Sequence, residues 1–169
     1  GGHVQKYLYS DHIRQDKTSG SKLWHQFLTQ NKKYYPIRCE VDLIHKLISS
    51  ISKNYDCIID FGLGDSNAIN HKLIPLLHSQ RSLKYYTAID ISDFQLENGL
   101  DIIKTLFTDI TLTSIKGDFY TPHKITSGTK RLGLFLGTTI SNQEMLPSHP
   151  FPEASIVKKM VALKLTLGE

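Results

Sequence analysis

The sequence predicts an α/β protein in which helices cover both faces of a parallel sheet and a helical segment precedes that sheet. From Cys57 onward, short apolar runs bounded by glycine alternate with stretches of helical periodicity. Before Cys57, apolar residues recur at steps of three or four, which is the spacing of amphipathic helices. The chain has 169 residues, 40% hydrophobic and 21% charged, which suits one domain with a buried core.

Two helices are predicted in the N-terminal segment. The stretch "SKLWHQFLTQ" follows a serine N-cap at 19–21 and places apolar residues on one helical stripe: Leu23, Trp24, Phe27 and Leu28. The following "YYPIR" predicts a turn, because Pro36 biases Tyr35 away from helical geometry and suits the first turn of the next helix. That next helix is expected over 38–53, where apolar residues again recur at helical spacing.

The sheet region opens with "CIIDF" at 57–61, a short apolar run typical of a strand buried on both faces. A helix can follow in "SNAINHKLIPLLHS", although Pro75 is expected to end or kink it. A second strand in "YYTAIDI" precedes a helix in "DFQLENGLDIIKTLF", whose inward side is expected to hold Leu96, Leu100, Ile103 and Phe107. Further strands are expected in "TLTSIKG" and "RLGLFLG". A last helix over 151–167 carries Ala154, Val157, Val161 and Leu165.

Charge and composition argue against several classes of partner. The net charge of +4 is mild, and its densest spots, Lys32-Lys33 and Lys158-Lys159, are short and separated, so we expect no nucleic-acid partner. No apolar run approaches the roughly 20 residues that span a bilayer, so we expect no membrane partner. The two cysteines, Cys39 and Cys57, form no CxxC and no Cys/His cluster, which favours a reducing, cytoplasmic location and no metal site.

Acids and glycines stand where the predicted strands end. In a doubly wound sheet, ligands bind beyond the carboxyl ends of the strands, and six candidates fall there: Asp60, Gly62, Gly64, Asp90, Asp118 and Gly137. Each has an ordinary structural alternative. The glycines can form a turn, Asp65 or Ser66 can cap a helix, Asp90 can cap the helix near Ser92, and Asp118 can form a turn beside a core Phe119.

Together these residues describe a pocket for an adenosine-bearing ligand. Glycines at 62 and 64 let a ligand approach the backbone, and Asp90, some 26 positions after Gly64, can accept both hydroxyls of a ribose. Asp118 can accept from an exocyclic amine and Phe119 can cover an adenine face. The third glycine of the dinucleotide fingerprint is absent, since Asn67 stands there. Acids at the turn suit a cation, so S-adenosylmethionine is preferred over NAD.

Five motifs in order resemble the histidine-specific Nα-methyltransferase family of ergothioneine biosynthesis, which includes fungal N-methyltransferases acting on a prenylated tryptophan. The matching stretches are "YLYSD" with "GSKLWHQFLTQNKKYYPIRCEVDLI", "DFGLGDSN", "YYTAIDIS", "GDFY" and "LFLGTTISNQ". The resemblance implies a Rossmann-like methyltransferase sheet and S-adenosylmethionine as cofactor. It implies that Gly62, Asp90, Asp118 and Phe119 contact the cofactor, and that Tyr35, Gly137 and Asn142 border an amino-acid substrate, most favourably histidine or a relative.

The same resemblance predicts how the chain is divided into functional parts, and the chain departs from the family pattern at particular positions. Residues 1–53 are expected to contribute to the substrate site and 54–169 to form the cofactor-binding domain. The chain is expected to span only the N-terminal part of the family's length, with an incomplete sheet that pairs with another chain or with missing C-terminal residues. Ala68 stands where the family usually has lysine, and Leu63 replaces a serine. No residue is assigned as catalytic base.

Two other classes stay open at this point. A non-catalytic nucleoside-binding or partner-binding module derived from such an enzyme is the alternative function, and a nicotinamide-dependent oxidoreductase is a third. A nucleic-acid methyltransferase is disfavoured, because it would usually carry an N/D-P-P-Y/F loop where this chain has "GTTIS".

Overall fold

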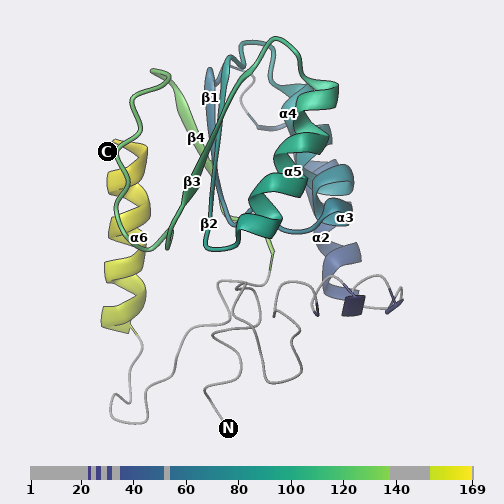
Figure 1. The fold of residues 1–169 in the computed structure, drawn as a ribbon, viewed down its shortest axis with the longest axis horizontal. Helices are drawn as coiled ribbons and strands as arrows, with labels where there is room; N and C mark the ends of the chain where they lie inside the picture. Colours follow the sequence, from purple (N-terminus) through teal and green to yellow (C-terminus); the bar gives the residue numbers. More distant parts are fainter. Residues whose placement is uncertain are drawn as a thin grey trace, which may run out of the picture.

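A four-stranded, all-parallel sheet lies at the centre of the computed structural model, which describes residues 23, 26–27, 30–31, 35–51, 54–137 and 153–168. Its strand order is β3-β2-β1-β4 (Figure 1). The strands are β1 (Cys57–Phe61), β2 (Tyr85–Asp90), β3 (Thr111–Lys116) and β4 (Arg131–Leu134). This arrangement confirms the predicted α/β class and its parallel sheet.

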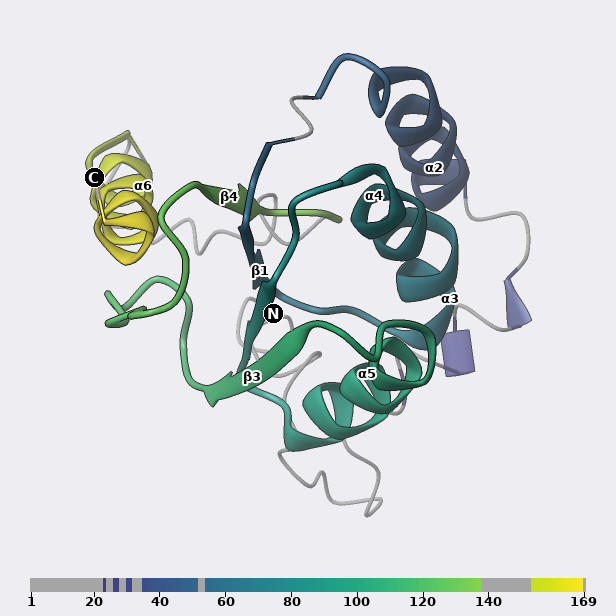
Figure 2. The same cartoon turned by 90° about the horizontal axis from the view of Figure 1, so that it is seen from above.

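Helices cover both faces of the sheet (Figure 2). On one face lie α2 (Tyr35–Leu47), a continuous helical run of α3 (Ser66–Ala68), η2 (Ile69–Leu73) and α4 (Ile74–Ser79), and α5 (Asp93–Leu106). The other face is covered by α6 (Glu153–Leu167). Of the helix predicted around Trp24, the described residues Leu23, Gln26, Phe27 and Gln30 are helical, and the rest lies outside the described residues.

The central strands hold the core. All five residues of β1 are buried, as are five of the six in β2, as expected for strands covered on both faces. One apolar cluster joins these strands to the helices of the first face and includes Ile58, Tyr86 and Ile103. A second joins them to α6 and includes Phe61, Phe119 and Leu163. The predicted inward side of α5 is confirmed, with Leu96 and Ile103 buried and Leu100 and Phe107 packed against the core.

The second predicted helix has different ends from those expected. α2 begins at Tyr35 and ends at Leu47, whereas the sequence pattern predicted 38–53 and a non-helical Tyr35. Pro36 lies in the first turn, where a missing N–H costs nothing. At the other end the Ser50 hydroxyl donates to the Leu47 carbonyl (2.7 Å), satisfying an acceptor that a further helical turn would otherwise use.

Pro75 does not end the helical run after β1. The backbone widens into the π-helical segment η2, and Pro75 follows in the first turn of α4, where its missing N–H is tolerated. Asp65 caps the start of this run by accepting from the Ala68 N–H (2.9 Å), as predicted for Asp65 or Ser66.

Three of the four apolar residues named on the last helix from the sequence are exposed. Val157, Val161 and Leu165 are 61%, 48% and 54% exposed, while Ala162, Leu163 and Thr166 are buried. The Thr166 hydroxyl accepts from the His123 N–H and donates to the Ala162 carbonyl, so a polar residue helps hold α6 to the sheet. Pairing of the exposed side with another chain stays a prediction.

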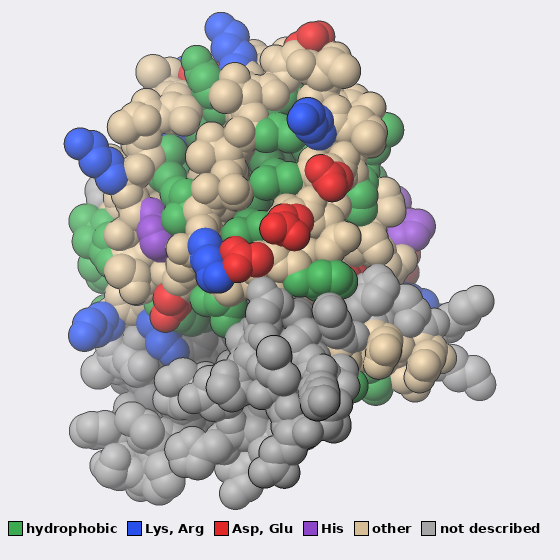
Figure 3. All heavy atoms as spheres, in the orientation of Figure 1, with side chains coloured by type: hydrophobic (Ala, Val, Ile, Leu, Met, Phe, Trp, Pro, Cys, Tyr) green, Lys and Arg blue, Asp and Glu red, His purple; other side chains and the backbone are tan. Residues whose placement is uncertain are grey.

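The described residues contain neither a membrane-spanning helix nor a metal-binding cluster. None of their helices is long and apolar enough to cross a membrane. No group of three or more His, Cys, Asp or Glu side chains within the described ranges is arranged to hold a metal ion. In the face shown in Figure 3, lysine and arginine side chains are separated from one another and interspersed with acids rather than gathered into a stripe.

Candidate functional site

The register of the sheet brings most of the predicted site residues to one edge. Phe61 pairs with Ile89 and Asp90 pairs with Lys116, while Asp60 pairs with Leu134 on the other side of β1. The residues that follow these pairs therefore lie side by side along the carboxyl ends of the strands. In spatial order the edge presents Asp118 and Phe119 after β3, Asp90 on β2, Asp60 to Gly64 on and after β1, and Gly137 after β4.

The loop after β1 has the backbone geometry that its glycines predicted. Gly62 and Gly64 have φ values of 94° and 75°, in the left-handed region that other residues adopt only with strain. The Gly62 N–H donates to the Ile89 carbonyl (2.9 Å), which fixes this turn to the end of β2. A Cβ on Gly62 would stand 3.6 Å from Cε1 of Phe119, so this main chain lies beside the aromatic ring.

Asp60 is a buried acid with an unused acceptor. Its side chain is 2% exposed, and its Oδ2 accepts a hydrogen bond from the Tyr86 hydroxyl (2.7 Å). Its Oδ1 is buried and has no hydrogen-bond partner among the described residues. Burial raises the pKa of Asp60 to about 7; the Tyr86 bond opposes the rise, nearby Asp90 adds to it and Lys72 opposes it. A buried acceptor without a donor favours a ligand that carries N–H groups.

Asp90 is buried at the end of β2 but does not cap α5. It is 8% exposed, and its Oδ1 accepts from the Ser92 N–H (2.9 Å). The N-cap of α5 is Ser92, whose hydroxyl accepts from the Gln95 N–H (3.2 Å). The alternative in which Asp90 caps the helix is therefore wrong: Ser92, two residues on, is the cap, and Asp90 forms the turn that leads into it.

Asp118 and Phe119 combine a turn with an aromatic cluster. Asp118 is exposed, and its Oδ1 accepts from the Tyr120 N–H (2.9 Å). Phe119 is 8% exposed and makes edge-on contacts with Tyr120 and Phe135, at ring-centroid distances of 4.7 and 5.3 Å. Since the same ring borders Gly62, the loop after β3 reaches back across the end of β2.

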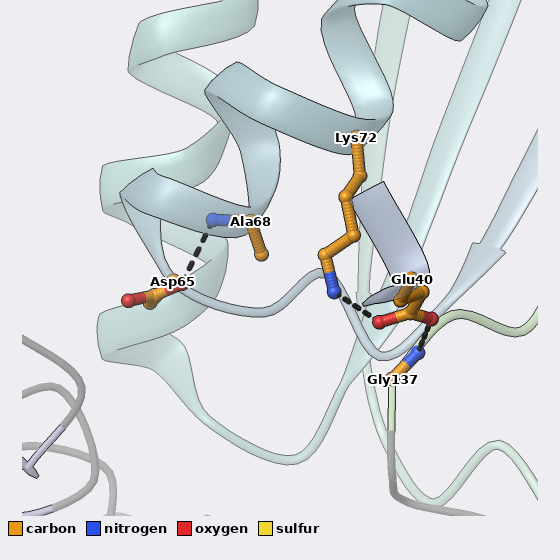
Figure 4. Close-up of polar contacts among 5 residues, drawn as sticks. All are labelled: Glu40, Asp65, Ala68, Lys72 and Gly137. Atoms are coloured by element: carbon orange, nitrogen blue, oxygen red, sulfur yellow. Dashed lines mark hydrogen bonds and ion pairs between the residues drawn. The ribbon is translucent and has the colours of Figure 1, made fainter. Parts of the chain in front are cut away.

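Gly137 is tied to the N-terminal helical segment. Its N–H donates to Oε1 of Glu40, and the other oxygen of Glu40 accepts from Nζ of Lys72 at 2.6 Å (Figure 4). Gly137 has φ 93°, and no described atom lies within 4 Å of the point where its Cβ would stand. Main chain that no described side chain covers therefore follows β4, the strand beside β1 and its loop of Gly62 and Gly64.

The other two predicted substrate residues are not brought to this edge by the described contacts. Tyr35, in the first turn of α2, is 68% exposed. Asn142 lies outside the described residues. His71, the histidine nearest to the ligand loop in sequence, is exposed, and its carbonyl lies 3.0 Å from Nε2 of His45.

A parallel sheet with glycines, buried acids and an aromatic ring at one carboxyl edge defines the class of nucleoside-binding α/β enzymes. A family model described as histidine-specific methyltransferase, SAM-dependent, matches residues 4–153. The chain belongs to this family, which confirms the resemblance, and it is an S-adenosylmethionine-dependent methyltransferase. A search of curated proteins found no match to the chain.

Three residues of this region were not foreseen from the sequence: Glu40, Lys72 and Tyr86. Lys72 carried a usable signal, because it follows Ile69 by three positions and precedes Leu76 by four, on the apolar side of its helix. A lysine on such a side must find a counter-charge when buried. Tyr86 carried none, since an aromatic residue in a buried strand is ordinary packing.

Proposed function

We propose that this methyltransferase transfers a methyl group to the amino group of an amino acid, with histidine or a close relative as the favoured acceptor. The observation that carries the proposal is the carboxyl edge itself. Buried acids on β1 and β2 and the glycine main chain after β1 lie near the aromatic ring that follows β3. The main chain at Gly137, which no described side chain covers, follows the neighbouring strand β4.

The residues of β1 and β2 fit the cofactor. Oδ1 of Asp60, which has no hydrogen-bond partner among the described residues, suits the ammonium of the methionyl part, and the carboxylate of Asp90 suits the two hydroxyls of a ribose. Gly62 and Gly64 leave main chain exposed between them. S-Adenosylmethionine carries no phosphate, so the site needs no phosphate-binding cation.

The residues after β3 and β4 complete the assignment. We assign Phe119 to one face of the adenine and Asp118 to its exocyclic amine. Tyr35, Gly137 and Asn142 are assigned to the acceptor, with residues 1–53 contributing to its site and 54–169 forming the cofactor-binding domain. The contact between Glu40 and Gly137 supports this division, since it links the N-terminal helical segment to the acceptor side.

Methyl transfer requires the protein mainly to place the two reactants. Bound S-adenosylmethionine supplies a methyl group already activated on a sulfonium. The acceptor's amino group must first lose its proton, to a neighbouring carboxylate or tyrosine, and the chain's residues have to hold the resulting lone pair in line with that methyl group and keep water out. Main chain without side chains at 62, 64 and 137 leaves room for both molecules to approach closely.

Calorimetry and turnover together test the proposal. S-Adenosylmethionine and its demethylated product are expected to bind, and NAD is not. Methylated histidine is then expected on turnover, with less product from amino acids that lack an imidazole. Binding of the sulfur nucleosides without methylation of any amino acid would favour the non-catalytic module, and failure of a folded chain to bind them would overturn the site assignment.

A further inference from the structure

One carboxylate joins three parts of the chain that are distant in sequence. Glu40 on α2 accepts from Lys72 on η2 and from the main chain of Gly137 after β4, which lie 32 and 97 residues away (Figure 4). Lys72 is 4% exposed, and the side chain of Glu40 is 24% exposed. The pair is therefore largely withdrawn from water, at the point where the acceptor side meets the ligand loop.

Burial makes this carboxylate hard to replace. An ammonium taken out of water is costly unless an anion compensates it, and Glu40 supplies that anion at 2.6 Å. Its second oxygen is then committed to the Gly137 N–H. Docking of α2 does not rest on this pair alone, since His45 on the same helix lies 3.0 Å from the His71 carbonyl.

Gly137 needs such an anchor more than the glycines after β1 do. Pairing between β4 and β1 stops at Leu134, three residues earlier, whereas the Gly62 N–H is still bonded to the neighbouring strand at Ile89. Gly137 also has a positive φ, and no described atom lies near the point where its Cβ would stand. Its backbone is thus held from the N-terminal helical segment, and that of Gly62 from within the sheet.

We infer that Glu40 is a positioning residue for the acceptor: its carboxylate holds the main chain at Gly137 against the helix that follows the ligand loop. The inference rests on the proposed function, in which Gly137 borders the acceptor. It makes acceptor binding depend on Glu40 and leaves nucleoside binding independent of it.

Two neutral double variants isolate the role of the accepting oxygen. In Glu40→Gln with Lys72→Met, the amide oxygen can still accept from Gly137. In Glu40→Leu with Lys72→Met, no acceptor remains, and neither variant leaves a buried charge unpaired. Replacing a buried ion pair by apolar groups is often neutral for stability, so both are expected to fold. Asp42→Asn, at an exposed acid on the same helix, is the matched control.

Hydrogen exchange and kinetics give the readouts. In the Leu/Met variant the Gly137 amide is expected to exchange at least ~10-fold faster and the KM for histidine to rise by roughly 10-fold, in line with loss of one ordinary hydrogen bond. The Gln/Met variant and Asp42→Asn are expected to stay near wild type. The Gly62 amide and the affinity for S-adenosylhomocysteine are expected to change less than about 2-fold in all variants.

Each contrary result has its own meaning. Equal Gly137 exchange in the two double variants would overturn the anchoring. Faster exchange with an unchanged KM, or a parallel loss of nucleoside affinity, would overturn the role in acceptor binding. Failure of the wild-type chain to methylate histidine would instead count against the proposed function, and the exchange comparison would still decide whether Glu40 anchors Gly137.

Discussion

The proposed nucleoside side and the proposed acceptor side of the carboxyl edge are built in different ways. On the proposed nucleoside side, β1 and β2 hold each other through sheet hydrogen bonds that continue to the Gly62 N–H, and two of the acids proposed for the cofactor, Asp60 and Asp90, belong to the strands themselves. On the acceptor side, Gly137 stands beyond the last pair of β4 and is held by a side chain from α2. The first side is held by the main-chain hydrogen bonds of the sheet, and the second by a side chain from a distant part of the sequence.

Replacing Asp90 is expected to have the largest effect on the nucleoside side. Asp90→Ala removes the acceptor assigned to two ribose hydroxyls, so the affinity for S-adenosylhomocysteine should fall at least ~100-fold by calorimetry. Asp93→Ala, at an exposed acid three residues on that pairs with Lys116, should change it less than about 2-fold. Similar losses in both variants would show that net charge near the loop, rather than the Asp90 contact, governs binding.

A pair of glycine variants tests the comparison directly. Gly62 and Gly137 have nearly equal φ values, 94° and 93°, so alanine at either position carries a similar backbone strain of about 1–2 kcal/mol. Gly62→Ala is expected to weaken nucleoside binding by about 10-fold, because its methyl group lies beside Phe119 where the ligand approaches. Gly137→Ala is expected to raise the KM of the acceptor instead.

The two glycine variants should therefore affect different constants. Calorimetry measures the dissociation constant of the nucleoside, and initial rates measure the KM of the acceptor. If both variants lower nucleoside affinity equally, the division of the edge into two sides is wrong. Thermal unfolding of both proteins controls for the shared strain.

Asp60 is expected to make nucleoside binding depend on pH. Burial raises the pKa of Asp60 to about 7; the Tyr86 hydrogen bond and Lys72 oppose the rise, and Asp90 adds to it. The carboxyl group therefore holds a proton over part of the neutral range. A cationic ligand favours the ionised form, and affinity should rise with pH by up to about tenfold per unit below 7. Asp60→Asn keeps the bond from Tyr86 and should give a flat profile; a profile unchanged by the substitution would assign the titration elsewhere.

The same group predicts the sign of a stability effect. Because the folded pKa lies above the unfolded value of 3.8, the folded state binds more protons between about pH 4 and 7. The free energy of unfolding should thus fall as pH rises through this window, by up to about 4 kcal/mol from Asp60. Urea unfolding of wild type and Asp60→Asn at several pH values measures the difference.

What could be predicted from the sequence differs between the two sides of the edge in the same way. Strand ends, the glycine turn and the Asp65 cap depend on neighbours in the chain, so alternation and turn chemistry were enough to predict them. The Glu40–Lys72 pair joins residues 32 apart, and no periodicity encodes which acid meets a buried lysine. The buried side of α6 could not be predicted for a related reason: Thr166 lies on it, and its hydroxyl accepts from the His123 N–H, whose position depends on the whole fold.

The smallest effect is expected at Phe119, where packing and proposed binding use the same ring. Phe119→Leu keeps an apolar side chain in the cluster with Tyr120 and Phe135 but removes an aromatic face, so nucleoside affinity should fall about 3- to 10-fold. Phe135→Leu makes the same change in the same cluster at the end of β4, and it should lower stability with little change in nucleoside affinity. If the two variants weaken binding equally, the ring of Phe119 acts through the core and not through the adenine. The acceptor KM should be unchanged in Phe119→Leu, because the contact between Glu40 and Gly137 does not involve this cluster.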